Sequence, residues 1–248
     1  DTIIYNHLRD KNIIIPLKGG PIDDTPLIGA YVKEPVVGFH NWVVSFDLNS
    51  LYPHLIMQYN ISPETKIEKS ADERFGMGPD NFLKASPDTY WKECHEKLDE
   101  FKREGHSVAA NGTCYRKDVR GFLPELMSKM YVDRKSSKKK MIEAQKELED
   151  LPNKNMLSLG RAGYTNKLNR EISKWDMRQM ALKIALNSAY GALGNKYFRY
   201  YDIDLAEAIT CSGQLSIRWI AKHMNEFLNK IVGTEDYDYV VASDTDSI

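Results

Sequence analysis

The stretch NKLNREISKWDMRQMALKIALNSAY, residues 166–190, predicts one long helix that ends at Gly191 and Gly194. A second long helix is predicted over residues 124–151. The segment between them is rich in residues that favour loops, namely Pro152, Asn153, Asn155, Gly160 and Gly163. Two long helices joined in this way most simply pack as an antiparallel hairpin.

β-Strand patterns flank this helical pair. The β-branched and aromatic run from Trp42 to Asp47 predicts a strand, after which Pro53 begins a helix that runs through Met57. A third long helix is predicted over residues 205–232 and a last strand over 239–242. The order strand, helical hairpin, helix, strand predicts an α+β fold, a platform into which a helical projection is inserted.

Between the first strand and the helical pair, Asn111-Gly112 is a hairpin turn signal. At the other end of the chain, Gly233 ends the third long helix. These turn and helix-ending residues predict where the chain changes direction.

Length and composition set the broad class. A chain of 248 residues can form one large domain or two smaller ones with a sizeable core. No apolar run is long enough to span a bilayer, so no membrane association is expected. Three widely spaced cysteines argue against a disulfide scaffold and indicate a reducing compartment. The ends of the sequence suggest a piece of a longer protein.

The formal net charge is −1, so composition alone does not indicate a nucleic-acid-binding protein. The distribution of charge is more informative. Residues 129–140 contain one acid, Asp133, and six cations: Lys129, Arg134, Lys135, Lys138, Lys139 and Lys140. A local basic stripe of this kind can attract phosphate while the whole chain stays neutral.

Three aspartates are candidates for metal binding. Asp47 ends one predicted strand, whereas Asp244 and Asp246 follow another, and on an extended segment these two point to the same side. Three converging carboxylates repel one another unless cations are present, and Mg²⁺ is the hard ion that suits oxygen ligands. Two such ions about 3.5–4 Å apart can clamp both oxygens of a phosphoryl displacement. The alternative is a polar turn without function.

One face of the helix over residues 166–190 suits a nucleotide. Lys183, Asn187 and Tyr190 follow one another at i, i+4 and i+7. Arg134 and Lys138 share a face of the preceding helix, so the paired helices could form one anion site. The alternative is a solvated basic face, with Tyr190 in the core.

These segments together resemble the three polymerase motifs of family B DNA polymerases. Asp47-Leu48-Asn49-Ser50-Leu51-Tyr52-Pro53 is similar to D-x-x-S-L-Y-P, Lys183 to Gly191 to K-x-x-x-N-S-x-Y-G, and Asp244 to Ser247 to D-T-D-S. The motifs occur in the family's order, and the resemblance covers nearly the whole chain. Segments such as residues 60–65 and 191–195 are similar to the replicative polymerases of T-even-like bacteriophages.

The resemblance implies a polymerase palm, an antiparallel sheet with helices, that carries an inserted two-helix fingers hairpin. Residues 1–29 would be the end of the region that follows an exonuclease domain. The palm would comprise residues 30–122 and 191–248, with fingers over 123–190. The implied activity is DNA-directed DNA synthesis from dNTPs, in replication of phage DNA, with two Mg²⁺ ions.

Residue roles follow from the same resemblance. Asp47 and Asp246 would ligate both metal ions and the Leu48 carbonyl one of them, with Asp244 a secondary carboxylate. The triphosphate would contact backbone N–H groups of Ser50 and Leu51. The remaining dNTP contacts would come from Tyr52 under the deoxyribose, and from Arg134, Lys138, Lys183 and Asn187 as the fingers close. Tyr190 would pack at the nascent base pair.

The sequence departs from the family pattern at three places. Ala242-Ser243 stands where Tyr-Gly usually precedes the third motif, and His54 stands where the first motif is usually followed by Ser. Residues 141–165 are shorter than the fingers of well-known phage enzymes. A second hypothesis is therefore a non-catalytic DNA-binding relative, which a primer-extension assay would distinguish from an enzyme.

The resemblance also implies partners and a location. They are primer–template DNA, dNTPs, a sliding clamp, a single-strand-binding protein and a helicase, in the cytoplasm of the infected bacterial host. We expect the 248-residue chain alone to be inactive, because its last strand would present an open edge.

Overall fold

The computed structural model describes residues 2–15, 17, 26–67, 97–151 and 158–248. The chain divides into two compact units, each described here by itself. Unit 1 comprises Asp1–Glu125 and Tyr190–Ile248, and unit 2 is Leu126–Ala189.

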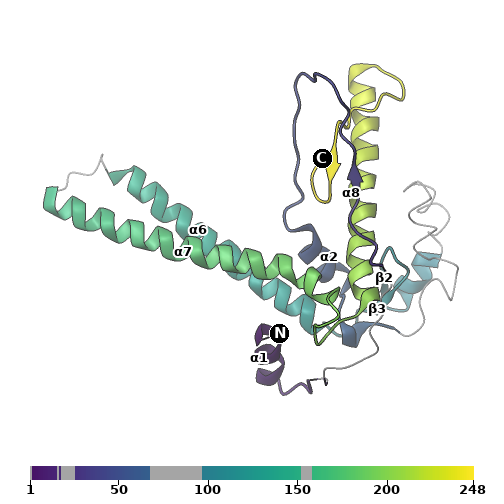
Figure 1. Cartoon of the computed structure of the whole chain (residues 1–248), viewed down its shortest axis with the longest axis horizontal. Helices are drawn as coiled ribbons and strands as arrows, with labels where there is room; N and C mark the ends of the chain where they lie inside the picture. Colours follow the sequence, from purple (N-terminus) through teal and green to yellow (C-terminus); the bar gives the residue numbers. More distant parts are fainter. Residues whose placement is uncertain (1, 16, 18–25, 68–96, 152–157) are drawn as a thin grey trace. The chain divides into compact units, whose positions relative to one another are not determined.

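Unit 1 contains the long helix α8, Ile203–Val232 (Figure 1). Its first turn is capped by the Asp202 carboxylate, which accepts from the backbone N–H groups of Asp204 and Leu205. Its end at Gly233, which has φ 75°, confirms the predicted stop. The first half of α8 is buried along residues such as Leu205, Ile209 and Ile217, and helix α2, Leu51–Tyr59, packs on it.

The segment before strand β1, Val32–Lys33, runs along α8. Thr210 donates its hydroxyl proton to the Ile28 carbonyl at 2.6 Å, and the Gln214 amide donates to the Gly29 carbonyl at 2.6 Å. β1 pairs antiparallel with β4, Ser243–Asp244, so that Val32 lies opposite Asp244. The contacts with α8 therefore hold the sheet that carries Asp244.

Unit 1 also contains a second antiparallel pair of strands. Strands β2, His106–Val108, and β3, Cys114–Arg116, flank the predicted turn at Asn111-Gly112, where Gly112 has φ 85°. The predicted hairpin is confirmed. Among its described residues, unit 1 also contains helix α1 over Thr2–Asp10, the 3-10 helix η1 over Pro63–Thr65 and a helical stretch at residues 97–103.

The expected strands of unit 1 are the least accurate predictions. Residues 42–46 form no strand, and only Asp47 takes part in a β-bridge. The last strand is Ser243–Asp244 instead of residues 239–242. In that segment the Val241 carbonyl accepts a backbone hydrogen bond from the Val36 N–H. A strand depends on the chain that pairs with it, which a local pattern does not specify.

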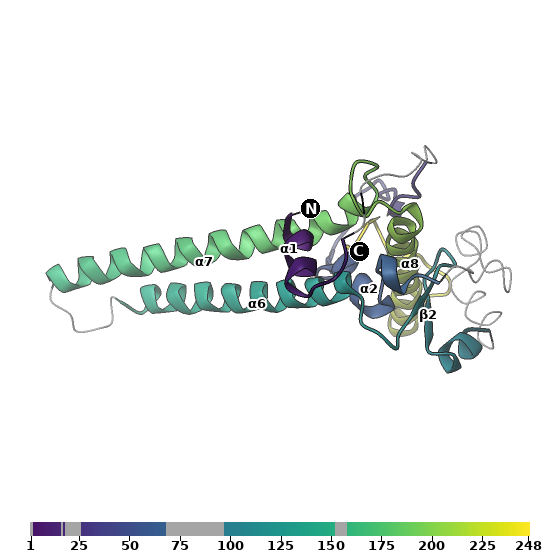
Figure 2. The same cartoon turned by 90° about the horizontal axis from the view of Figure 1, so that it is seen from below.

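Unit 2 consists of most of two long helices, α6 over Phe122–Glu149 and α7 over Ser158–Leu193. They lie side by side along their length in both views (Figures 1 and 2). The Tyr164 hydroxyl of α7 donates to the Glu147 carboxylate of α6 at 2.6 Å, and the Lys140 ammonium lies 4.3 Å from the ring centre of Trp175. The predicted antiparallel pairing is confirmed.

The bounds of α7 differ from the prediction at both ends. Gly160 and Gly163 were expected in a loop, and Gly191 at the end of the helix, yet all three lie within α7. An added side chain at Gly163 or Gly191 would meet no atom within 4 Å, so neither glycine marks a tight turn. Glycine costs only about 1 kcal/mol in a helix, which the surrounding residues offset.

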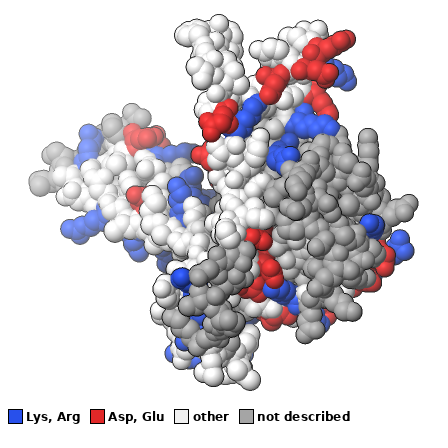
Figure 3. Space-filling model, turned by 45° about the vertical axis from the view of Figure 1, so that its right-hand side comes forward, with Lys and Arg blue, Asp and Glu red and all other residues white. Residues whose placement is uncertain are grey.

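Lys and Arg side chains are spread over the surface of the helical pair (Figure 3). None of the helices in the described part of the chain is both long and apolar enough to cross a bilayer.

Candidate active site

Backbone pairing in unit 1 brings the first and third motifs together. Phe46 and Ile248 exchange two N–H···O bonds of 2.8 and 2.9 Å, and the Leu48 N–H donates to the Asp246 carbonyl at 2.8 Å. Asp47 forms an antiparallel bridge with Ser247. Asp47 and Asp246 therefore lie on neighbouring segments although 199 positions separate them in the sequence.

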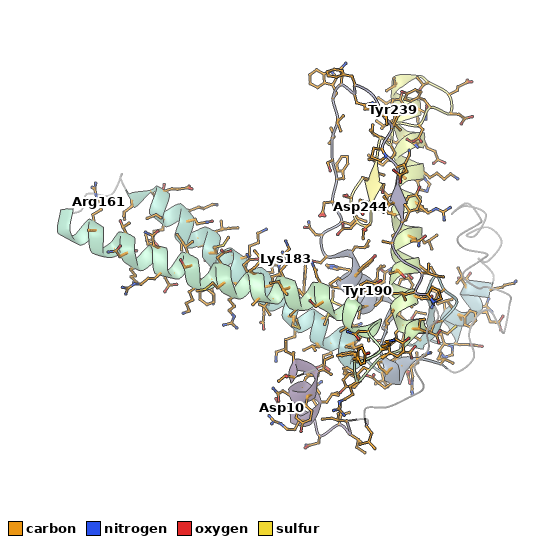
Figure 4. All side chains as sticks on the ribbon, viewed as in Figure 1. Asp10, Arg161, Lys183, Tyr190, Tyr239 and Asp244 are labelled. Atoms are coloured by element: carbon orange, nitrogen blue, oxygen red, sulfur yellow. The ribbon has the colours of Figure 1, made fainter. Side chains whose placement is uncertain are left out.

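A tight turn follows β4. The Ser247 N–H donates to the Asp244 carbonyl at 2.9 Å, and Thr245 is left-handed with φ 55°. The expectation that Asp244 and Asp246 belong to one extended segment is wrong, because this turn lies between them. Asp244 stays at the end of β4 (Figure 4), and Asp246 belongs to the turn.

The charges of Asp47 and Asp244 act on Asp246. Burial raises the pKa of Asp246, and the charges of Asp47 and then Asp244 raise it further. Among the residues described, however, no three acid, His or Cys side chains converge closely enough to hold a metal ion on their own. The arrangement therefore provides carboxylates that repel one another, but the described side chains do not form a complete set of metal ligands.

This donor set fits Mg²⁺. The ion takes oxygen ligands, and protein sites commonly supply only one or two carboxylates while water and substrate phosphates complete the octahedron. Asp47 and Asp246 are such a pair, and a divalent cation would offset the repulsion that raises the pKa of Asp246.

Two tyrosines pack beside these aspartates. The ring centres of Tyr52 on α2 and Tyr190 are 4.8 Å apart, tilted by 58°. Burial, then Tyr190, then the charges of Asp246 and Asp244 raise the pKa of Tyr52 to about 12. The phenol therefore stays protonated at neutral pH and lies close enough to the aspartates to sense their charge.

Gly213 of α8 makes room for Tyr52. A Cβ atom at this position would come within 2.9 Å of Tyr52 Cε1, closer than real Cβ contacts. The sequence prediction missed Gly213, although a glycine inside an amphipathic helix is itself a signal of close approach.

The turn that begins α2 is held by His54. Ser50 is left-handed, with φ 56° and ψ 46°, and its carbonyl accepts from the His54 N–H at 3.1 Å. The His54 Nδ1 lies 2.9 Å from the same carbonyl oxygen, so the imidazole donates a second hydrogen bond there. The departure from the family pattern at His54 thus adds a bond to the turn that carries Ser50 and Leu51.

Ser243 has a similar role in the other turn. Its side chain is buried, and its hydroxyl donates to the Ser247 carbonyl at 3.0 Å. This bond spans the turn that contains Asp246, which a glycine at position 243 could not do.

The predicted triphosphate ligands lie on the helices of unit 2. Lys183 and Asn187 are exposed on α7, one turn apart, and Lys183 is labelled in Figure 4. Arg134 and Lys138 are likewise one turn apart on α6. The contacts Lys140–Trp175 and Glu147–Tyr164 fix the antiparallel register. In this register, Arg134 of α6 and Lys183 of α7 are offset by roughly one helical turn along the helix axes.

Comparisons with known proteins give a consistent result. A family model described as DNA polymerase family B matches residues 1–159 and 161–248. The chain is 34% identical over 282 residues to the DNA-directed DNA polymerase of Enterobacteria phage T4, covering 100% of this chain and 29% of that protein. The DNA-directed DNA polymerase of Escherichia phage RB69 is 34% identical over 279 residues, with the same two shares.

A solved structure is also similar. The family B DNA polymerase from the hyperthermophilic archaeon Pyrobaculum calidifontis matches with a TM-score of 0.56 and 26% sequence identity. The match covers 99% of this chain and 25% of that one. The chain thus spans less than a third of the length of these relatives.

Proposed function

The chain belongs to the family B DNA polymerases, and we propose that it carries the catalytic centre of a DNA-directed DNA polymerase. The reaction transfers a deoxynucleotide from a dNTP to a primer 3′-hydroxyl under the direction of a template. A bond forms between the primer 3′-oxygen and the α-phosphorus, and pyrophosphate leaves. The single observation that carries the proposal is the pairing of residues 46–48 with 246–248, which brings Asp47 beside Asp246.

We assign the metal ligands to Asp47 and Asp246, with the Leu48 carbonyl as a ligand of one of two Mg²⁺ ions. When bound, the ions stabilise the attacking and leaving oxygens of the displacement. Asp244 acts less directly, since it lies at the end of β4 on the other side of the turn from Asp246. Its charge contributes to the local field that favours cations.

The left-handed turn at the start of α2 suits the triphosphate. Backbone N–H groups of Ser50 and Leu51 stand at a helix N-terminus, where anions are stabilised. Tyr52 lies under the deoxyribose, where its ring excludes a 2′-hydroxyl by contact. Tyr190, whose ring lies tilted against that of Tyr52, packs at the nascent base pair.

In this proposal unit 1 contains the palm, over residues 30–122 and 191–248, and unit 2 corresponds to the fingers, over 123–190. Residues 1–29 end the region after an exonuclease domain. Arg134, Lys138, Lys183 and Asn187 hold the triphosphate, as cations and an amide can.

The partners and location are part of the same proposal. They are primer–template DNA, dNTPs, a sliding clamp, a single-strand-binding protein and a helicase, in phage DNA replication in the host cytoplasm. The 248-residue chain on its own is inactive, because it spans only 29% of the phage relatives.

Primer extension by the intact protein tests the proposal. Asp47→Asn removes a metal ligand while keeping the size of the side chain, so synthesis falls by at least about a thousandfold and DNA binding persists. Synthesis at the wild-type rate in this variant would overturn the metal assignment. A wild-type protein that binds primer–template DNA but does not extend it would favour the non-catalytic relative instead.

A further inference from the structure

A second basic face runs along α7. Lys167, Arg170, Lys174 and Arg178 follow one another at i, i+3, i+7 and i+11, so they lie on one side of the helix. All four side chains are exposed. With a rise of 1.5 Å per residue they span about 17 Å along the axis.

This face is distinct from the one proposed to hold the triphosphate. Lys174 precedes Lys183 by nine residues, and Arg178 precedes Asn187 by nine. Nine residues make two and a half helical turns, so each pair lies on opposite sides of α7. A nucleotide held by Lys183 and Asn187 therefore leaves Lys174 and Arg178 unused.

The second basic face also points away from α6. The buried positions of α7 in unit 2 include Leu168, Gln179 and Leu186, which share one side of the helix. Trp175, which lies against Lys140 of α6, is on the same side. The four cations lie roughly 80–160° around the helix from that side, and so face solvent.

The charges of this face are not neutralised within the described residues. No carboxylate there lies within ion-pair distance of Lys167, Arg170, Lys174 or Arg178. Of the two acids of α7, Asp176 accepts from the Gln179 amide at 2.9 Å. Glu171, which lines one surface hollow together with Lys167, Arg170 and Lys174, accepts from the Trp175 indole at 2.9 Å. Lys174 and Arg178 lie over the Trp175 ring and Lys167 over the Tyr164 ring, contacts that leave the positive charges without a carboxylate partner. A row of such cations favours a polyanion.

Polar and apolar side chains lie beside the four cations of this face. Two shallow hollows on the surface of α7 are lined by three of the four cations, Lys167, Arg170 and Lys174, together with Gly163, Asn166, Asn169, Glu171, Ser173 and Met177. Exposed apolar side chains continue along this flank, with Met177 68%, Met180 43% and Ile184 60% accessible. Amide and hydroxyl groups can bond base edges, and apolar side chains can contact base faces, both of which single strands expose.

We propose that this face of α7 binds single-stranded DNA, with phosphates along Arg170, Lys174 and Arg178 and bases toward Met177. In the polymerase proposed above, whose template provides the strand, it is a site for the unpaired template ahead of synthesis. A duplex would present its bases less readily to the apolar flank, which is why a single strand is favoured over double-stranded DNA.

The test compares two primer–template DNAs bound to the intact protein. One has an unpaired template of one nucleotide and the other of about 12 nucleotides, within the span of known single-strand sites. The variant combines Arg170→Ala, Lys174→Ala and Arg178→Ala. Its matched control removes three exposed cations from unit 1 by combining Lys102→Ala, Arg103→Ala and Lys117→Ala.

We expect the α7 variant to bind the long-overhang DNA about tenfold more weakly than wild type at moderate salt. The slope of the logarithm of its binding constant against the logarithm of the salt concentration should be shallower by about two, because fewer counterions are released. Binding and single-nucleotide extension of the short-overhang DNA stay at wild-type levels, as do all properties of the control. The proposal is overturned if the variant binds both DNAs like wild type, as it would if the face served an acidic protein. Equal weakening on both DNAs, or in the control, also overturns it. Failure of wild type to extend any primer would instead contradict the proposed polymerase function.

Discussion

The two units of this chain differ most in charge. Unit 2 contains 14 Lys and Arg against 7 Asp and Glu, a formal charge of +7, whereas unit 1 contains 20 against 28, a charge of −8. The net value of −1 hides this division. Opposite charges in the two units suit the proposed roles, carboxylates of unit 1 as ligands of cations and basic residues of unit 2 as ligands of phosphates.

The units also differ in how they hold their candidate residues. In unit 1, Asp47, Tyr52 and Asp246 are fixed by backbone pairing, ring contacts and a glycine-sized space. In unit 2, Lys183, Asn187 and the second basic face are exposed on two paired helices. Changes in unit 1 should therefore affect geometry and rate, and changes in unit 2 should affect affinity.

The largest effect expected from this comparison separates two carboxylates of unit 1. Asp246→Asn removes a proposed metal ligand and should lower the rate of nucleotide incorporation about a thousandfold or more. Asp244→Asn removes only a nearby charge and should lower it about tenfold. Single-turnover incorporation by the intact protein measures both, and equal losses would contradict the unequal roles.

The next effect concerns the sugar. Tyr52→Ala removes the ring that contacts Tyr190 and lies beside the aspartates, so ribonucleotides should enter about tenfold more readily relative to deoxynucleotides. The ratio of rNTP to dNTP incorporation efficiencies provides the measurement. Lys183→Ala in unit 2 is the control, since it should weaken both nucleotides alike; an unchanged ratio in Tyr52→Ala would remove the tyrosine from sugar selection.

Replacing one glycine in each unit should have smaller effects on stability, and in opposite directions. Gly213→Ala puts a Cβ within 2.9 Å of Tyr52 Cε1, so it should destabilise the protein by about 1–3 kcal/mol and shift the rNTP to dNTP ratio. Gly163→Ala in α7 meets nothing within 4 Å and should be neutral or stabilising by up to about 1 kcal/mol. Thermal unfolding with the selectivity assay compares them. If Gly213→Ala left both stability and selectivity at wild-type values, the close contact with Tyr52 would be unsupported.

The smallest effect comes from the turns of unit 1. His54→Ala removes the imidazole bond to the Ser50 carbonyl, and Ser243→Ala removes the hydroxyl bond to the Ser247 carbonyl. Each should cost about 1 kcal/mol of stability, with little change in the affinity for DNA. Denaturant unfolding checks the values. Stability unchanged in both variants would show that these bonds do not hold the turns.

Much of this structure could be predicted from the sequence. The three long helices and the turns at Gly112 and Gly233 follow from local periodicity and punctuation, and the family motifs point to the aspartates and to Tyr52. The α+β class is consistent with the mixture of long helices and small sheets. These features depend on residues close in the sequence or on patterns shared by the family.

The remaining features depend on contacts through space. Residues 42–46 have a strand composition but pair only at their end, and the left-handed Thr245 separates two aspartates that seemed to share an extended segment. The fit of Gly213 against Tyr52 joins α8 to α2 across more than 150 positions. The roles of His54 and Ser243 likewise require the carbonyl groups that they bond. Local sequence rules do not encode such distances.

The division between the units is tested most directly by the dependence of single-turnover incorporation on dNTP concentration in the intact protein. Asp246→Asn of unit 1 should reduce the maximal rate by about a thousandfold, with a smaller change in the apparent dNTP affinity. Lys183→Ala of unit 2 should weaken that affinity about tenfold or more, because it removes the charge-assisted contact proposed between Lys183 and the triphosphate. A wild-type maximal rate in Asp246→Asn, or wild-type affinity in Lys183→Ala, would contradict the account.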